Sequence, residues 1–137
     1  MALVDHIGVT VDDVPRAAAQ FDPVLRALGY SRVDGDDAVS WHTGQETEII
    51  LYPAREEGTG PHRHGRVGWQ HLAFSVESRA EVERLHAIAL EAGWSAVRDP
   101  KEYPRYTERY YASFVEDENG IRIELMYNPP RETAAGT

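Results

Sequence analysis

Apolar and polar residues alternate along two short segments, residues 6–11 and 71–76. In both, the second, fourth and sixth positions are apolar, and the first position is a histidine, His6 or His71. The other positions hold small residues. Because successive side chains of a strand point to opposite faces, each segment is expected to be a strand with one apolar face and one face that carries the histidine.

A helical pattern follows each of these strands. Apolar residues recur at spacings of three and four from Val14 to Leu28 and from Arg79 to Ala92, which predicts helices with one buried stripe. Pro23 lies inside the first of them. It is expected to kink or break that helix, because an interior proline removes one hydrogen bond and costs about 3 kcal/mol.

Short strands are expected after each helix, near residues 31–33, 38–42 and 46–52 and then near residues 95–98, 110–116 and 121–127. The chain is therefore predicted to be a single α+β domain, residues 1–128, made of two β-α-β-β-β modules at about 3–55 and 68–128. The modules are expected to form a curled mixed sheet with the helices on its outer face. Residues 129–137 are small and polar and are expected to be a disordered tail.

The alternation also places three metal-ligating side chains on corresponding faces. In residues 121–127 the odd positions are apolar, so Glu124 lies on the opposite face, as His6 and His71 do in their strands. If the two halves pair around a pseudo-twofold axis, a curled sheet brings these three side chains together. Two imidazoles and a carboxylate hold a divalent ion and leave positions open for a substrate or O₂. The alternative is that the histidines are structural and the glutamate is solvated.

Three segments resemble the vicinal oxygen chelate superfamily: residues 4–9 (VDHIGV), 70–74 (QHLAF) and 117–125 (DENGIRIEL). This superfamily includes glyoxalase I, extradiol dioxygenases, fosfomycin-resistance thiol transferases and bleomycin-resistance binding proteins. The resemblance covers about residues 3–127. It implies paired modules that hold a metal in a cupped sheet, with His6, His71 and Glu124 at the ligand positions. It also implies a homodimer, in which His6 can meet the partner subunit's His71.

Glyoxalase I places a further glutamate on the last strand of its first module. Aligning residues 49–52 with residues 124–127 puts Ile49 at that position. Glu48 is then expected to face the other side of the sheet, unless a bulge turns it inward. The three-ligand site that results resembles the dioxygenases and the fosfomycin-resistance enzymes more than glyoxalase I. Because the ligands are nitrogen and oxygen, Fe²⁺, Mn²⁺, Ni²⁺, Co²⁺ and Zn²⁺ all fit.

The function expected from these ligands is that of a metal-dependent enzyme acting on a small oxygenated molecule, with an extradiol-type dioxygenase favoured. An isomerase or thiol transferase, and a metal-free drug-binding protein, are the alternatives. Candidate acid–base residues are Tyr111 and His64, and candidate substrate contacts are Arg122, Ser113 and Tyr103. Tyr106 and Tyr110 are further candidates for lining the pocket. Ordinary packing is the alternative for the tyrosines, and a solvated loop for His64.

Composition narrows the remaining choices. The 14 Lys and Arg residues against 23 Asp and Glu give a net charge of −9, which argues against nucleic acid or an anionic membrane as a partner. The chain has no cysteine, so thiolate ligands and nucleophiles are excluded. Residues 1–10 lack the basic and apolar regions of a secretory signal, and no apolar run reaches about 18 residues. A cytoplasmic protein is therefore expected.

Overall fold

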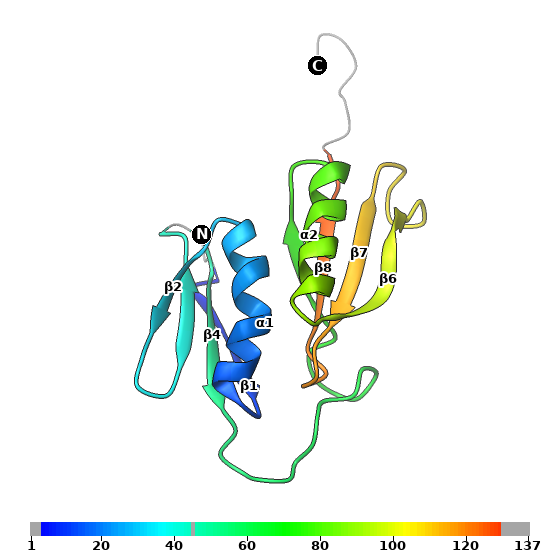
Figure 1. Ribbon diagram of the computed structural model, residues 1–137. Coiled ribbons are helices and arrows are strands. Elements are labelled where there is room, and N and C mark those ends of the chain that lie inside the picture. The colour runs from blue at the N-terminus through cyan, green and yellow to red at the C-terminus, as the bar shows by residue number, and fades with distance from the viewer. Residues whose placement is uncertain (1–3, 45, 130–137) are drawn as a thin grey trace.

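The computed structural model describes residues 4–44 and 46–129, so most of the expected tail (130–137) lies outside it. Each half folds as β-α-β-β-β (Figure 1). The first comprises β1 (His6–Val11), α1 (Val14–Ala27), β2 (Ser31–Asp34), β3 (Val39–His42) and β4 (Glu48–Pro53). The second comprises β5 (Leu72–Ser75), α2 (Arg79–Glu91), β6 (Ser95–Glu102), β7 (Tyr111–Glu116) and β8 (Arg122–Tyr127). The predicted α+β class and two-module order are confirmed.

The strands form two four-stranded mixed sheets, in the orders β1-β4-β3-β2 and β5-β8-β7-β6. In each sheet the first strand pairs in parallel with the last strand of its module, and the other pairs are antiparallel. Within the described residues no ladder joins the two sheets, so they form neither one continuous sheet nor a closed barrel. In Figure 1 the edge strands β2 and β6 lie at the outer ends of the molecule.

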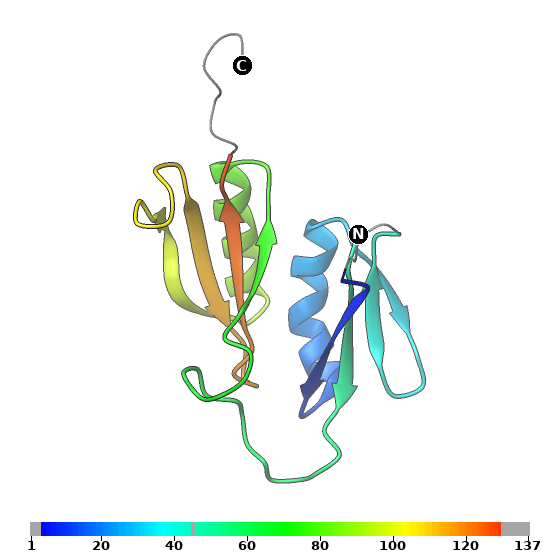
Figure 2. The ribbon, with the colours of Figure 1, turned by 180° about the vertical axis from the view of Figure 1, so that it is seen from behind.

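Each helix covers one face of its own sheet, and the two helices lie side by side in the middle of the molecule (Figure 1). Seen from behind, β5 and β8 lie in front of α2 (Figure 2). No helix among the described residues is long and apolar enough to cross a membrane.

Helix α1 starts where Asp13 accepts a hydrogen bond from the Arg16 amide, at 3.0 Å, which satisfies one of the free N–H groups of the first turn. The helix runs through Pro23 without a break, so the expected break is wrong. The proline deprives the Ala19 carbonyl of its usual amide partner. Pro23 and Ala19 are both exposed, so water can solvate that carbonyl, which reduces the cost of the proline.

The strand faces are as the alternation predicts. In β1, Ile7, Val9 and Val11 pack into the core, whereas His6, Gly8 and Thr10 are exposed. In β8, Ile123 and Leu125 are buried in the same core. One cluster of buried apolar side chains runs through both modules, so the modules share a core even though their sheets do not join.

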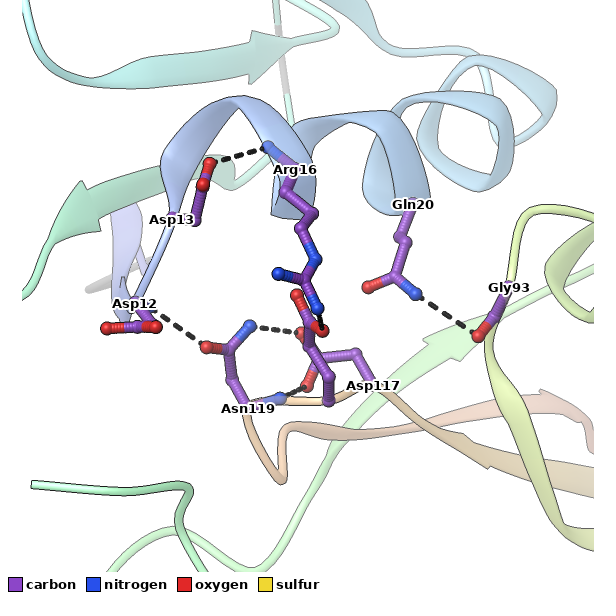
Figure 3. Close-up of polar contacts among 8 residues, drawn as sticks. Asp12, Asp13, Arg16, Gln20, Gly93, Asp117 and Asn119 are labelled. Atoms are coloured by element: carbon purple, nitrogen blue, oxygen red, sulfur yellow. Dashed lines mark hydrogen bonds and ion pairs between the residues drawn. The ribbon is translucent and has the colours of Figure 1, made fainter. Parts of the chain in front are cut away.

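The junction between the modules is well packed and hydrogen-bonded. The rings of Phe21 and Trp94 meet edge to face with centroids 4.7 Å apart, and the Trp94 indole N–H donates to the Gln20 carbonyl at 2.8 Å. The Gln20 amide in turn donates to the Gly93 carbonyl at 3.1 Å (Figure 3). These contacts hold α1 against the segment that follows α2, and so they fix the orientation of the two modules relative to each other.

A second set of contacts ties the β7–β8 turn to the start of α1 (Figure 3). Oδ1 of Asn119 accepts a hydrogen bond from the Asp12 amide at 2.9 Å. Asn119 is itself held by Asp117, which accepts from its amide nitrogen at 3.0 Å and from its side chain at 2.9 Å. Arg16 forms an ion pair with Glu118. The turn that precedes the strand of Glu124 is thus anchored to the other module.

Candidate functional site

A histidine and a glutamate meet on the face of the second sheet that α2 does not cover. Glu124 lies in the middle of β8, where it pairs in register with Ala73 of β5. His71 immediately precedes β5, and its Nε2 lies 2.9 Å from Oε1 of Glu124. Glu124 is 3% exposed. This distance is that of a hydrogen bond between the imidazole and the carboxylate. The contact brings together two side chains of the kinds that ligate metal ions.

The other oxygen of Glu124 accepts a hydrogen bond from the hydroxyl of Tyr110. Burial and this hydrogen bond raise the pKa of Tyr110 well above its usual range, so the phenol keeps its proton. Tyr110 therefore fixes the orientation of the Glu124 carboxylate.

His6, the third predicted ligand, lies on the other module. Its side chain is 52% exposed, and its Nδ1 lies 2.7 Å from Oδ2 of Asp5. The hydrogen bond to Asp5 is the main cause that raises the pKa of His6. Within residues 4–44 and 46–129, no group of three His, Asp or Glu side chains is arranged to hold a metal ion. One chain thus presents His71 and Glu124 as a pair and His6 separately.

Both histidines have the same local hydrogen bond. Nδ1 of His6 faces Asp5, and Nδ1 of His71 lies 2.8 Å from the side-chain oxygen of Gln70. In each case the residue just before the histidine supplies the acceptor. An acceptor at Nδ1 is the partner that metal-binding histidines commonly have at the ring nitrogen that does not bind the ion. In His71 the other ring nitrogen, Nε2, is hydrogen-bonded to Glu124. The two halves of the repeat therefore give their histidines the same kind of neighbour at Nδ1.

An aromatic group borders the His71–Glu124 pair. The Phe114 ring meets His71 edge to face at 5.4 Å, and Tyr103 packs against Phe114 at 6.0 Å and Tyr110 at 6.3 Å. Tyr106 stacks on Tyr103 at 5.6 Å. Tyr103 is buried, which raises the pKa of its hydroxyl. The predicted substrate contact Tyr103 thus lies beside the candidate ligands as part of an apolar wall.

Tyr111 and Ser113 do not lie with these residues. The Tyr111 hydroxyl donates to Glu83 of α2 at 2.7 Å, and the Arg79 guanidinium lies 4.8 Å from its ring centre. Ser113 is fully buried in the same strand. Residues 111, 113 and 115 point toward the helix, whereas 112 and 114 point to the face of Glu124. The alternation thus brings Tyr110, and not the predicted acid–base residue Tyr111, to Glu124.

The two remaining candidates lie in different surroundings. Arg122 shares the face of Glu124, as predicted, but its guanidinium lies 3.3 Å from the Glu116 carboxylate. His64 is exposed in the segment between the modules. Its neighbour His62 anchors that segment, because the His62 amide donates to the Asn119 carbonyl at 2.9 Å.

The prediction for Glu48 is wrong. His6 pairs in register with Glu48 across the parallel strands β1 and β4, and Gly8 pairs with Ile50. Directly opposed residues share a face, so Glu48 lies on the face of His6. Because Gly8 corresponds to Ala73, the partner of Glu124, the position equivalent to Glu124 in the first module is Ile50 and not Ile49. The position is therefore held by an apolar residue, as expected, but this residue is Ile50 and not Ile49.

A family model described as the Glyoxalase/Bleomycin resistance protein/Dioxygenase superfamily matches residues 3–125. The chain belongs to this superfamily. The resemblance inferred from the three sequence segments is thereby confirmed, and the superfamily's two-module fold agrees with the observed element order.

Several proteins are similar over nearly the whole chain. The uncharacterized protein YqjT of Bacillus subtilis is 27% identical over 123 residues, which are 88% of this chain and 95% of the relative. A solved protein from Bacillus halodurans is 25% identical, with a TM-score of 0.76 and coverage of 93% of this chain and 96% of its own. Fosfomycin resistance protein FosX from Mesorhizobium loti is 15% identical, with a TM-score of 0.68 over 94% of each chain; this likeness shows the fold alone.

Proposed function

We propose that this superfamily member is a divalent-metal-dependent enzyme whose site is shared between two subunits of a homodimer. His6 of one subunit and the partner subunit's His71 and Glu124 are the ligands. The observation that carries this proposal is the 2.9 Å contact between His71 and Glu124 on an uncovered sheet face. His6 occupies the equivalent strand position of the other module and is oriented by the same kind of hydrogen bond.

The surface next to His71 supports a second copy of the chain as the missing partner. Val67 is fully exposed and Trp69 is 85% exposed, only two residues before His71. Large apolar side chains left in water favour association that buries them. The proposal requires that the first module of this partner lie against the His71–Glu124 pair.

The chemistry follows from the ligand set. A divalent ion held by two imidazoles and one carboxylate supplies a Lewis acid with open positions for two adjacent substrate oxygens, or for O₂ if the ion is iron. Ile50 offers no donor at the position equivalent to Glu124, so three protein ligands are available. Tyr110 keeps the Glu124 carboxylate oriented, and the aromatic wall restricts water around it. These features fit an extradiol-type dioxygenase, which is the function proposed first.

Two other functions share parts of this support. An isomerase or thiol transferase would use the same three ligands, and the fold of FosX is similar. A metal-free binding protein would need neither the three ligands nor the hydrogen bonds that Asp5 and Gln70 form with the two histidines.

Elemental analysis of the purified protein tests the proposal. We expect metal in the native protein and a strong loss of it in His6→Ala, His71→Ala and Glu124→Ala, because each change removes a ligand. His64→Ala, which changes an exposed histidine between the modules, is the control and should keep its metal. Full occupancy in the three ligand variants would refute the site. A second measurement tests the dioxygenase proposal. Fe²⁺ is restored to the protein under anaerobic conditions, and O₂ and a catechol are then added. The proposal predicts O₂ uptake, and no uptake would favour the isomerase or transferase.

A further inference from the structure

The pairing of β6 with β7 is irregular on both sides of Arg98. Arg98 pairs with Phe114. Lys101 is three residues further along β6, but its partner Ala112 is only two residues from Phe114. A bulge of this kind inserts an extra residue and so re-aims side chains. Directly opposed residues share a face, and Phe114 and Ala112 lie on the face of Glu124. Arg98 and Lys101, here called the β6 cations, therefore lie on that face as well.

The β6 cations lie across the sheet from the proposed metal ligands. Glu124 of β8 pairs with Phe114 of β7, which in turn pairs with Arg98 of β6. Neighbouring strands lie about 4.8 Å apart, so the backbone of Arg98 is about 10 Å from that of Glu124. The Phe114 ring, on the strand between them, meets His71 edge to face at 5.4 Å. The face thus carries two ligands, then an aromatic ring, and then two cations at its edge.

The carboxylates of β6 contact the helix on the other side of the sheet. Oδ1 of Asp99 lies 3.4 Å from Nε2 of His86. Glu102 accepts a hydrogen bond from Arg79 at 2.8 Å, and both partners belong to α2. Within residues 4–44 and 46–129, neither of the β6 cations forms an ion pair. Their charges are therefore free to act on a bound anion.

A buried hydroxyl lies beside the β6 cations. Tyr103 is 5% exposed and packs on Phe114 at 6.0 Å, and Nζ of Lys101 lies 5.0 Å from the centre of its ring. Burial is the main cause that raises the pKa of Tyr103, and the positive charge of Arg98 acts in the opposite direction. Among the described residues its hydroxyl has no hydrogen-bond partner. Most buried hydroxyls have one, so an acceptor on a bound ligand is the partner expected here.

The loop after β6 adds a further cation to this border. The Arg105 guanidinium lies 4.9 Å from the centre of the Tyr106 ring, and Tyr106 stacks on Tyr103 at 5.6 Å. Glu108 and Arg109 of the same loop are both exposed, and their charges offset each other. In a chain of net charge −9, this edge of the second sheet is therefore locally positive.

We propose that the β6 cations bind an anionic group of the substrate, such as a carboxylate, at the end that lies away from the metal. This inference rests on the proposed function, because it places the other end of the substrate at the His71–Glu124 pair. The anion subsite itself is formed within one chain. The Tyr103 hydroxyl donates to the same anionic group, and an apolar part of the substrate lies over Phe114. Charge-assisted hydrogen bonds make such a group bind more tightly than a neutral one, whereas a cationic group is repelled.

Binding of three hydroxamates to the zinc-loaded protein tests this inference, because the same hydroxamate group chelates zinc in all of them. Benzohydroxamate has no further substituent, whereas 4-carboxybenzohydroxamate and 4-(aminomethyl)benzohydroxamate carry an anionic and a cationic group at the far end of the ring. We expect the carboxylate to bind about tenfold more tightly than benzohydroxamate, and the ammonium compound to bind more weakly.

Variants of the β6 cations then locate the effect. Arg98→Gln and Lys101→Gln should each reduce the advantage of the carboxylate to about threefold or less, while the zinc content stays unchanged. Arg84→Gln is the matched control. It removes the same charge from an exposed residue of α2, which pairs with Glu81 on the other side of the sheet, and should leave the advantage as it is.

The outcomes separate this inference from the proposed function. Equal affinities for the three hydroxamates, or an advantage that persists in either variant, would overturn the anion subsite and leave the metal site intact. If the protein holds no zinc, the proposed function fails, and benzoate and benzamide are titrated into the metal-free protein instead. The subsite then predicts that benzoate, but not benzamide, shifts the NMR signal of the Arg98 Nε–H group, assigned from the spectrum of Arg98→Gln. An unchanged signal with benzoate would overturn the subsite independently of the metal.

Discussion

Nε2 of His71 and Oε1 of Glu124 lie 2.9 Å apart, although 53 residues separate them in the sequence. The parallel pairing of β5 with β8 creates this contact, because it sets Ala73 opposite Glu124 and so directs the glutamate toward the start of β5. In the first module the same pairing of β1 with β4 sets Gly8 opposite Ile50. The repeat thus builds the same scaffold twice but places a carboxylate at this position in the second module.

Removing the acceptor at Nδ1 should weaken metal binding without removing a ligand. We expect Asp5→Ala and Gln70→Ala each to lower the affinity for zinc by about 10- to 100-fold, because the imidazole loses its fixed tautomer and orientation. Asp5→Asn keeps an acceptor oxygen and should lose less. Zinc titration against a competing chelator measures all three variants. Unchanged affinity in both alanine variants would show that these hydrogen bonds do not prepare a metal site.

The turn before β8 should be intolerant of a side chain at Gly120. Its φ is +76°, and an added Cβ would lie 1.7 Å from the His62 carbonyl oxygen. We expect Gly120→Ala to lower the free energy of unfolding by about 3 kcal/mol, from backbone strain and from displacement of the segment that holds His62. Gly58→Ala, at φ +71° with no atom within 4 Å of its Cβ, should cost only about 1–2 kcal/mol. Equal losses in urea denaturation would contradict the contact with His62.

Asp117 should make the junction between the modules respond to pH. Burial raises the pKa of Asp117 above its usual value, even though Asn119 and Ile121 donate hydrogen bonds to it. Between the ordinary pKa and this raised value, the folded chain binds more protons at Asp117 than the unfolded chain does. The contribution of this group to stability therefore increases as the pH falls through its folded pKa and decreases as the pH rises through it.

The matched variant is Asp117→Asn, which cannot titrate. We expect the difference in unfolding free energy between the native protein and this variant to shift in favour of the native protein as the pH is lowered from 7 toward 4. Urea denaturation at several pH values measures it, and NMR titration of the Asp117 carboxyl gives its pKa directly. A carboxyl that titrates at or below the ordinary pKa would contradict this prediction.

Strand alternation was sufficient to place His6, His71 and Glu124 on the correct faces, because a buried apolar face fixes the phase of each strand. It could not give the register between strands, which depends on loop length and pairing, and so Glu48 was assigned to the wrong face. The pattern could not show that Tyr110, rather than Tyr111, lies beside Glu124, because these two residues are neighbours at the point where β7 begins and only the packing of α2 shows which one it covers.

One error in element bounds and the absence of the expected helix break have local causes. The strand expected near residues 95–98 extends to Glu102, through Pro100, because β6 is an edge strand and an edge strand tolerates a residue without an N–H. Helix α1 continues through Pro23 because the affected carbonyl lies at the exposed side. The proposed assembly of two chains is not encoded in either periodicity, and so the pattern gives no position for His6 relative to the His71–Glu124 pair of a second chain.

The most direct test of a site shared between subunits mixes two variants that each lack one proposed metal ligand. His6→Ala keeps His71 and Glu124, and His71→Ala keeps His6, so neither homodimer has a complete ligand set. After subunit exchange, a shared site predicts that the mixed dimer regains one complete set and binds about one metal ion per dimer, as elemental analysis of the isolated mixed dimer would show. A mixed dimer that binds no more metal than the two parent variants would contradict the shared site.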